Sequence, residues 1–242
     1  MSEALFHFHG PLADLLIAKR AAVSFSYACA RAATLKNAIE ALGVPHTEIG
    51  ALRVNHRDAT LDRIVRDGDL IEVHARGAEP APETGFVADA HLGGLARFLR
   101  MLGYDTAHRN DLDDVEIRRL ANDERRVVLS RDRELLKCRD IARGCFVRAL
   151  KAEEQLREVA ARYRLAERAR PFTRCLHCNL PLVAIDKASV IDRLPERVRE
   201  IHERFVRCPG CERIFWEGTH YERMRAVLQE LLPQHAAARP VE

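Results

Sequence analysis

Between Phe86 and Leu150 the chain repeats one pattern: a short apolar run, an acidic residue at or soon after its end, and then a stretch with helical spacing. Strands that alternate with helices predict a parallel sheet, and right-handed crossovers bring the carboxyl ends of its strands to one edge. We therefore expect an α/β domain with acidic side chains at the edge where open α/β sheets bind ligands. The runs and their acids are Phe86–Ala88 with Asp89, Tyr104–His108 with Asp111, Val127–Leu129 with Asp132, and Cys145–Leu150 with Glu153 and Glu154.

The helical spacing between these runs differs in strength. The stretch after the first run places five apolar residues on one helix face, whereas the stretch after the second run does so only loosely. The first set is Leu92, Leu95, Ala96, Leu99 and Leu102, and the looser set is Val115, Leu120 and Ala121.

Residues 1–76 are predicted to form a separate β-rich domain, since a chain of 242 residues has room for two or three small domains. Thr34 is a suitable N-cap for its one predicted helix, and Gly43 stands where a left-handed residue often ends a helix. The order strand, strand, helix, strand, strand resembles the β-grasp, ubiquitin-like fold. The strands are marked by Ala4, Phe6 and Phe8, by Val23, Phe25 and Tyr27, by Ala51–Val54 and by Leu70–His74.

The sequence DGDLIEV at 67–73 is similar to the ending of the sulfur-carrier relatives of this fold. Sulfur carriers finish on a free Gly-Gly tail, whereas here Arg76, Gly77 and Ala78 lead into more chain. The resemblance therefore implies a docking or substrate-binding module with a protein as its candidate partner, and not a carrier.

The remaining boundaries follow from composition and spacing. Residues 77–85 hold two prolines and two glycines without apolar periodicity and are a predicted linker. The α/β domain is expected to span 86–165 and a cysteine-rich unit 171–226, followed by a helix end and disordered tail over 227–242. Within the third unit, helical spacing after Pro195 is carried by Val198, Ile201, His202 and Phe205.

Two Cys-x-x-Cys pairs form the most specific motif in the chain. Two such pairs give the four-sulfur tetrahedral shell that Zn²⁺ prefers, and a closed shell leaves no position for a substrate. We predict a structural zinc ribbon, in which the long insert between the pairs folds as a lobe of its own. The zinc ligands are Cys175, Cys178, Cys208 and Cys211, and the other three cysteines, Cys29, Cys138 and Cys145, are expected to be buried packing residues.

Arginine outnumbers lysine 34 to 5, a bias that coding preference explains more simply than function. Because the formal net charge is only +3, any nucleic-acid affinity has to come from locally placed arginines. Arg97 and Arg100 are expected on the helix face opposite the apolar stripe, and Arg131 adjoins Asp132. Arg213 and Trp216 lie near the second cysteine pair. The alternatives are a solvated helix face, an ion pair and a place in the ribbon core, respectively. The candidate RNA-binding residues are Arg97, Arg100, Arg131, Arg213 and Trp216.

Three or four converging carboxylates could hold Mg²⁺ or Mn²⁺ for phosphodiester hydrolysis. Asp89 and Asp132 are the firmest candidates because both follow β-rich runs directly or nearly so. Asp111 comes next, although two neighbouring acids, Asp113 and Asp114, compete with it and could instead begin a helix.

The fourth acid is Glu153 or Glu154, which stand at the start of the last predicted helix of this domain, where capping is an alternative role for both. Of these two we include Glu154 in the predicted catalytic set.

Residues 86–226 resemble the PIN-like ribonuclease family named after the C-terminal domain of the Mut-seven exonuclease. The stretches that carry the resemblance are FVADAHLGGLARFLRMLGYDT, VVLSRDRELL, EEQLREV, TRCLHCN and RCPGCERIFWEGTHYERM. Bacterial members end in a zinc ribbon and often begin with a ubiquitin-like domain. The resemblance implies a PIN-type sheet, Mg²⁺ or Mn²⁺, and RNA cleavage, with Asp89, Asp111 and Asp132 at the acidic positions. The chain departs from the family at Ser130, where threonine is common.

The leading hypothesis is a metal-dependent ribonuclease, and the alternative is a non-catalytic RNA- or ribosome-binding adaptor with a vestigial nuclease site. A receiver-type phosphoacceptor at Asp132, followed by Lys151, is a third class, but the zinc ribbon has no part in it. Nucleotide-binding Gly-rich and phosphate-loop motifs are absent from the sequence. No long apolar window or leader is present, so we expect a cytoplasmic protein, with a homodimer as a further possibility because PIN-like domains often dimerise.

Overall fold

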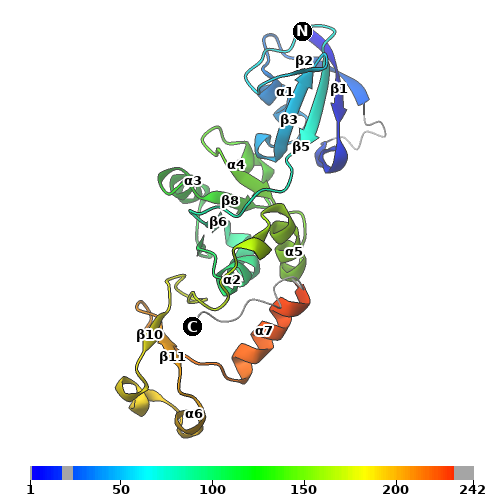
Figure 1. Cartoon of the computed structure of the whole chain (residues 1–242). Helices are drawn as coiled ribbons and strands as arrows, with labels where there is room; N and C mark the ends of the chain where they lie inside the picture. The colour runs from blue at the N-terminus through cyan, green and yellow to red at the C-terminus, as the bar shows by residue number, and fades with distance from the viewer. Residues whose placement is uncertain (1, 18–23, 232–242) are drawn as a thin grey trace. The chain divides into compact units, whose positions relative to one another are not determined.

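The computed structural model describes residues 2–17 and 24–231 (Figure 1). The chain divides into two compact units. The first comprises Met1–Ala78 with Asp113–Arg148, and the second comprises Glu79–Leu112 with Ala149–Glu242. Val23, predicted in a strand, and residues 232–242 of the predicted tail lie outside the described residues.

The N-terminal part of the first unit is a five-stranded sheet in the order β2-β1-β5-β3-β4. Strands β1 and β5 are parallel, and the other neighbours are antiparallel. The elements follow the predicted order of strand, strand, helix, strand, strand with the short β4 in addition, and the core contains Phe6, Phe8 and Ile71, none of which is exposed. The elements are β1 (Ser2–Phe8), a 3-10 turn (Gly10–Leu15), β2 (Ser24–Cys29), α1 (Leu35–Ala41), a second 3-10 turn (His46–Glu48), β3 (Ile49–Val54), β4 (Arg57–Asp58) and β5 (Leu70–Ala75).

Helix α1 begins and ends as its sequence predicts. The Thr34 hydroxyl accepts a hydrogen bond of 3.2 Å from the Asn37 amide, which satisfies one of the free N–H groups of the first turn. Leu35 and Ile39 are fully buried on the face that packs into the sheet core. Gly43 has a φ of 106°, a conformation that only glycine adopts without strain.

The rest of the first unit contains α3 (Asp114–Asp123), β8 (Val127–Ser130), α4 (Arg133–Lys137) and β9 (Gly144–Phe146). Strands β8 and β9 are parallel, as expected, and every residue of β8 is fully buried. This segment packs against the β-grasp part of the same unit. The His46 Nε2 atom lies 2.9 Å from the Ile141 carbonyl oxygen, and the Phe146 amide donates to the Glu48 carboxylate at 2.8 Å.

The second unit opens with β6 (Phe86–Ala88), a 3-10 turn (Ala90–Leu92), α2 (Gly93–Met101) and β7 (Thr106–Ala107), and β6 and β7 are parallel. Helix α2 packs on α5 (Ala152–Arg162), where Gly94 permits a close approach: a Cβ atom on Gly94 would lie 2.7 Å from that of Ala152. The predicted linker contacts the C-terminal end of α5, since the Glu79 amide donates to the Arg162 carbonyl at 2.9 Å.

The cysteine-rich part of the second unit has an antiparallel sheet in the order β10-β11-β12. Its small core consists of Val190, Leu194 and Phe205, with Trp216 packed against them. The elements are 3-10 turns (Leu165–Glu167, Lys187–Ser189, Ile191–Arg193), β10 (Val183–Ile185), α6 (Glu196–Ile201), β11 (Phe205–Arg207), β12 (Ile214–Phe215) and α7 (Thr219–Leu231).

Three local expectations were wrong. Helix α6 ends at Ile201, and Phe205 belongs to β11, because its ring is needed in the ribbon core. In α3 the buried residue is Ile117, which is 1% exposed, whereas Val115 is 72% exposed. The strands β7 and β9 are shorter than the apolar runs that predicted them. None of the described helices is long and apolar enough to cross a membrane.

Candidate functional site

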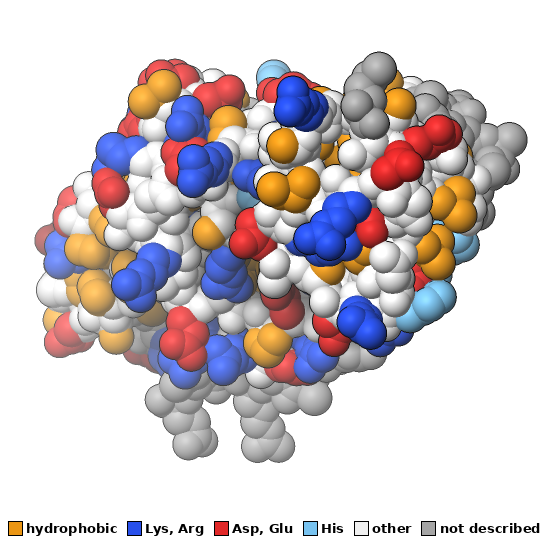
Figure 2. Space-filling model, turned by 90° about the horizontal axis from the view of Figure 1, so that it is seen from above, with side chains coloured by type: hydrophobic (Ala, Val, Ile, Leu, Met, Phe, Trp, Pro, Cys, Tyr) orange, Lys and Arg blue, Asp and Glu red, His pale blue; other side chains and the backbone are white. Residues whose placement is uncertain are grey.

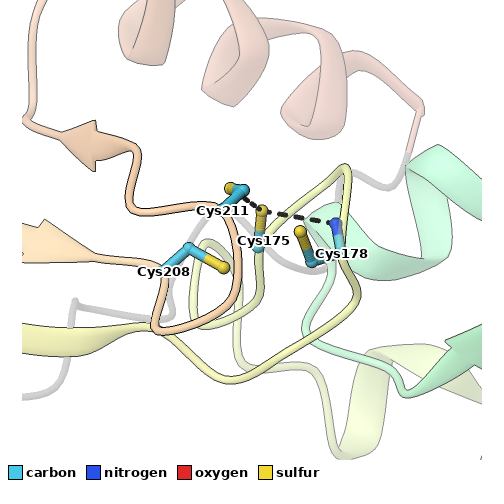
Figure 3. Close-up of side chains that lie close together, drawn as sticks. All are labelled: Cys175, Cys178, Cys208 and Cys211. Atoms are coloured by element: carbon cyan, nitrogen blue, oxygen red, sulfur yellow. Dashed lines mark hydrogen bonds between the residues drawn. The ribbon is translucent and has the colours of Figure 1, made fainter.

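The four predicted zinc ligands lie together in the ribbon (Figure 3). Their Sγ atoms are all within 4.8 Å of one another, and those of Cys175 and Cys211 are 3.8 Å apart. A tetrahedral zinc ion with Zn–S bonds of about 2.3 Å places its sulfurs about 3.8 Å apart. The cluster therefore has the right donors and spacing to bind zinc.

The thiols of this cluster differ in acidity. Burial raises the pKa of Cys208, but hydrogen bonds from the backbone N–H groups of Cys211 and Gly210 and from the Cys211 and Cys175 thiols together outweigh burial and bring it to about 7. Burial and the neighbouring thiols raise the pKa of Cys178 to about 12. Because zinc binds thiolates, metal binding would release the protons that the other thiols retain.

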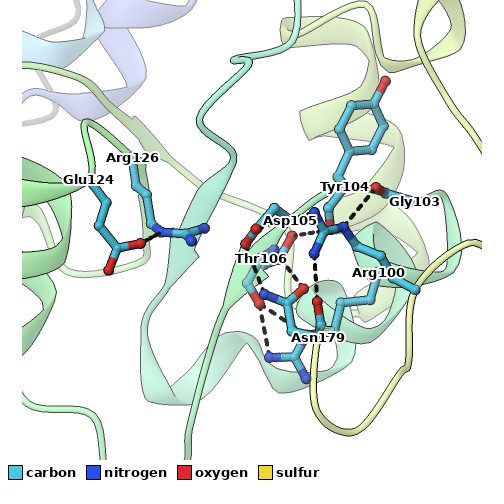
Figure 4. Close-up of polar contacts among 9 residues, drawn as sticks. Arg100, Gly103, Tyr104, Asp105, Thr106, Glu124, Arg126 and Asn179 are labelled. Atoms are coloured by element: carbon cyan, nitrogen blue, oxygen red, sulfur yellow. Dashed lines mark hydrogen bonds and ion pairs between the residues drawn. The ribbon is translucent and has the colours of Figure 1, made fainter. Parts of the chain in front are cut away.

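Arg100 on helix α2 binds the backbone between the first pair of cysteines, and Figure 4 draws its contacts with Thr106. Its Nε and Nη2 atoms donate to the Thr106 carbonyl at 3.0 and 2.9 Å. Its Nη1 atom donates to the carbonyls of Leu176 and His177 at 3.0 and 3.1 Å. The expectation that Arg100 lies on an exposed helix face was wrong. Arg100 is only 7% exposed, because the loop between the first two cysteines covers it.

A second set of contacts joins the ribbon to β7. The Thr106 amide donates to the Asn179 side-chain oxygen at 3.0 Å, and the Asn179 side-chain nitrogen donates to Asp105 at 2.8 Å. Arg174 forms an ion pair with the same Asp105 at 3.3 Å. Sequence reasoning missed these residues. The only signal in the sequence was that Asn179 directly follows the predicted zinc ligand Cys178. In the structure Asn179 has a φ of 63°, in the left-handed region.

Asp89 lies where the sequence predicts, at the carboxyl end of the fully buried strand β6. It is 6% exposed, and its Oδ1 atom accepts a hydrogen bond of 2.9 Å from the His91 amide. A carboxylate this buried is uncommon unless it is paired, hydrogen-bonded or bound to a metal.

Three segments of the second unit meet beside the start of α2. A Cβ atom on Gly93 would lie 3.1 Å from the His108 ring, and one on Gly94 would lie 2.7 Å from Ala152 at the start of α5. The first turn of α2, the segment after β7 and the first turn of α5 are therefore neighbours. Glu153 and Glu154 are exposed in that first turn, where the positive end of the helix dipole favours carboxylates.

His108 is a candidate site residue that sequence reasoning missed. Burial lowers the pKa of its imidazole and the nearby Arg100 lowers it further, whereas the hydrogen bond to the Ala90 carbonyl and the charge of Asp89 partly oppose this shift. Its Nε2 atom donates to the Ala90 carbonyl at 3.4 Å, which leaves Nδ1 as the acceptor. The signal was its position at the end of the second apolar run, where acids follow the other runs.

The other predicted acids have separate environments. Asp111 has a side chain that is 81% exposed and pairs with Arg109 at 3.1 Å, which lowers the pKa of the carboxyl. In the first unit, Asp132 caps α4 by accepting from the Glu134 amide at 2.7 Å. Asp113, the competitor of Asp111, caps α3 by accepting from the Glu116 amide at 2.8 Å.

Within the described ranges, two groups of three or more potential metal ligands lie within 4.8 Å of one another: the four cysteines, and His9, Glu72 and His74. The predicted acids are not in such a group. Of the predicted RNA-binding residues, Arg97, Arg131 and Arg213 are exposed. Trp216 is partly buried, with its ring centroid 6.5 Å from that of Phe205.

Basic and acidic side chains are interspersed on the face drawn in Figure 2, as the small net charge of +3 suggests. On that face the arginines do not form a continuous positive field, so phosphate contacts would depend on individual side chains.

Two family models match this chain. The family model of the Mut7-C RNAse domain matches residues 84–228, which is more than half of the chain, and the model of the Mut7-C ubiquitin matches residues 1–79. Neither the search of curated proteins nor the search of solved structures gave a match. The chain therefore belongs to the Mut7-C RNase domain family and carries a Mut7-C ubiquitin-like domain at its N-terminus.

Proposed function

We propose that this protein is a metal-dependent ribonuclease that hydrolyses RNA phosphodiester bonds. Asp89, Asp111 and Asp132 would hold Mg²⁺ or Mn²⁺, and Glu154 would complete the catalytic set. The observation that carries the proposal is Asp89, a carboxylate 6% exposed at the end of a buried strand, in a chain of the Mut7-C RNase family.

The metal would activate a water molecule and neutralise charge on the phosphate when bound. Asp89 would provide a rigid ligand, since its backbone follows a strand and its side chain is fixed by the His91 amide. Glu154, in the first turn of α5, would position the attacking water or accept its proton. His108 would accept a proton or hydrogen bond at Nδ1, because its Nε2 atom is engaged with a backbone carbonyl.

RNA would be bound by separate side chains and not by a broad positive surface. Arg97, Arg131 and Arg213 would pair with phosphates, and the accessible part of the Trp216 ring would stack on a base. The four-cysteine ribbon would bind zinc structurally, and the ubiquitin-like domain would bind a protein partner. A thiolate zinc site suits the reducing cytoplasm, where we place the protein.

The test is cleavage of single-stranded and structured RNA by the full-length protein with Mg²⁺ or Mn²⁺. Asp89→Asn and Asp132→Asn are suitable variants because asparagine is as good an N-cap as aspartate, so each removes the charge and keeps the turn. Asp113→Asn is the matched control, because it makes the same change at the cap of α3. Equal activity in the wild type and both test variants, at every metal, would contradict the proposal.

The second candidate is an RNA- or ribosome-binding adaptor without catalysis. It is favoured by one observation: Asp89 and Asp132 both cap turns or helices, and Asp111 pairs with Arg109, so each acid has a role that needs no metal. Tight RNA binding without cleavage, together with no calorimetric signal from Mn²⁺ at these acids, would support this function instead.

A further inference from the structure

The β-grasp sheet has a histidine-rich outer face that neither the acidic site nor the ribbon uses. Along β1, Phe6 and Phe8 point into the core, so His7 lies on the opposite face, as does His9, which directly follows the strand in extended conformation. Along β5, the residues that alternate with core Ile71 and Val73 are Glu72 and His74. Strands β1 and β5 are parallel neighbours with His7 opposite Glu72, which brings these polar side chains together.

Three of these side chains offer ligand atoms at metal-binding distances from one another. One ligand atom from each of His9, Glu72 and His74 lies within 4.8 Å of the other two. The His9 Nε2 atom is 3.8 Å from the Glu72 Oε1 atom, which is too long for a hydrogen bond. Nitrogen and oxygen ligands about 2.1 Å from a tetrahedral zinc ion lie about 3.4 Å apart, so this separation is close to that of a ligand pair.

Two ring nitrogens in this group, one from His9 and one from His74, lack hydrogen bonds within the described part of the chain. The Nε2 atoms of His9 and His74 are both buried, and neither has a hydrogen-bond partner among the described residues. Buried polar atoms in folded proteins normally have hydrogen-bond partners. Two unpaired nitrogens this close together could both be satisfied by a single bound ion. Glu72 has a second histidine nearby, since the His56 Nδ1 atom lies 3.6 Å from its Oε2 atom, but that ring is 79% exposed and outside the three-ligand group.

We infer that His9, Glu72 and His74 form a binding site for a divalent transition-metal ion of the zinc class. Two imidazoles and one carboxylate suit zinc, nickel or copper and do not suit Mg²⁺, which prefers oxygen ligands. Three protein ligands leave one coordination position for water or for a side chain of a partner. The site is separate from the four-cysteine ribbon and from the acids of the proposed nuclease centre.

Metal binding requires one local movement. The rings of His9 and His74 are stacked, with centroids 4.0 Å apart and planes 7° apart, whereas two imidazoles bound to one ion direct their in-plane lone pairs at the same point. One ring must therefore turn about its Cβ–Cγ bond. That torsion is broad for histidine, so the backbone of the two strands need not change.

The test uses the full-length protein with zinc already bound at the four cysteines, titrated with Co²⁺. We expect a further equivalent of cobalt to bind, with visible d–d absorption and without the thiolate-to-cobalt charge-transfer band that a cysteine site would give. The variants are His9→Ala, His74→Ala and Glu72→Gln, and His220→Ala, which removes an exposed histidine on α7, is the control.

Each of the three site variants should weaken cobalt binding at least ten-fold, whereas the control should bind like the wild type. Circular dichroism verifies that each variant is folded, and Glu72→Gln, which preserves side-chain size, decides the matter if a histidine variant does not fold. The inference is overturned if the folded wild type binds no further cobalt. It is equally overturned if binding persists unchanged in folded Glu72→Gln or in a folded histidine variant.

Discussion

Arg100 donates a hydrogen bond of 3.1 Å to the carbonyl oxygen of His177, a residue that stands between the two cysteines of the first zinc-binding pair. The same guanidinium also holds the Thr106 carbonyl on β7. One buried side chain therefore links helix α2, strand β7 and the four-cysteine ribbon within the second unit.

Arg100→Leu should lower the free energy of unfolding of the second unit by about 3 kcal/mol, because it leaves buried carbonyls without their charged donor. Urea unfolding followed by circular dichroism measures the change. Arg97→Leu is the control on the same helix and should change stability by less than about 0.5 kcal/mol, since Arg97 is exposed. Equal effects of the two substitutions would show that the Arg100 contacts contribute little.

Cys208→Ser should abolish retention of the ribbon zinc, because three thiolates and a hydroxyl no longer provide the four-sulfur shell. Zinc remaining after dialysis against a weak chelator, measured by mass spectrometry, should fall at least ten-fold. Cys138→Ser, which changes a partly buried cysteine outside the cluster, should retain zinc like the wild type. Retention of zinc by Cys208→Ser would contradict the assigned ligand set.

Glu48→Ala should loosen the packing of β9 on the β-grasp part of the first unit. The Phe146 amide donates to the Glu48 carboxylate at 2.8 Å, so its hydrogen exchange should become at least ten-fold faster when that acceptor is removed. Hydrogen exchange read by NMR or mass spectrometry reports this amide. His56→Ala, an exposed substitution in the same domain, should leave the exchange rate unchanged.

Asp69 should make part of the stability of the β-grasp domain depend on acidity. Two hydrogen bonds from Arg63, at 2.7 and 3.1 Å, lower the pKa of this carboxyl below its usual value. A lowered folded-state pKa gives stability that is present above the unfolded pKa of about 3.9 and is lost as pH falls through the folded value.

The free energy of unfolding of Asp69→Asn should therefore be lower than that of the wild type near pH 7, with a difference that narrows from about pH 5 towards pH 2. Urea unfolding across this range checks it. Asp58→Asn removes a carboxylate that is 91% exposed and should follow the wild-type curve. A constant difference between wild type and Asp69→Asn at all pH values would rule out the ion pair as the cause.

The sequence predicted the local parts of the fold well. Thr34 and Gly43 mark the ends of α1, the apolar stripe of α2 is buried, and the four cysteines meet, because capping, periodicity and metal ligation each depend on short-range spacing. The family and its domain order were also predicted correctly.

The errors came from tertiary contacts that spacing does not show. Arg100 shares a helix with the exposed Arg97, and only the position of the cysteine loop buries it. Phe205 fits a helical pattern but is needed in the ribbon core. The group of His9, Glu72 and His74 gave no motif in the sequence, because its members come from two distant strands that the β-grasp topology makes neighbours.

The most direct test of the proposed function is the single-turnover rate of RNA cleavage by Asp89→Asn and Asp113→Asn in Mn²⁺. Both variants replace a capping aspartate with an equally good cap, so they differ in whether the lost charge belongs to the proposed metal site. We predict that Asp89→Asn cleaves at least about 100-fold more slowly than the wild type, while Asp113→Asn stays within about two-fold. Cleavage by folded Asp89→Asn at the wild-type rate would contradict the account.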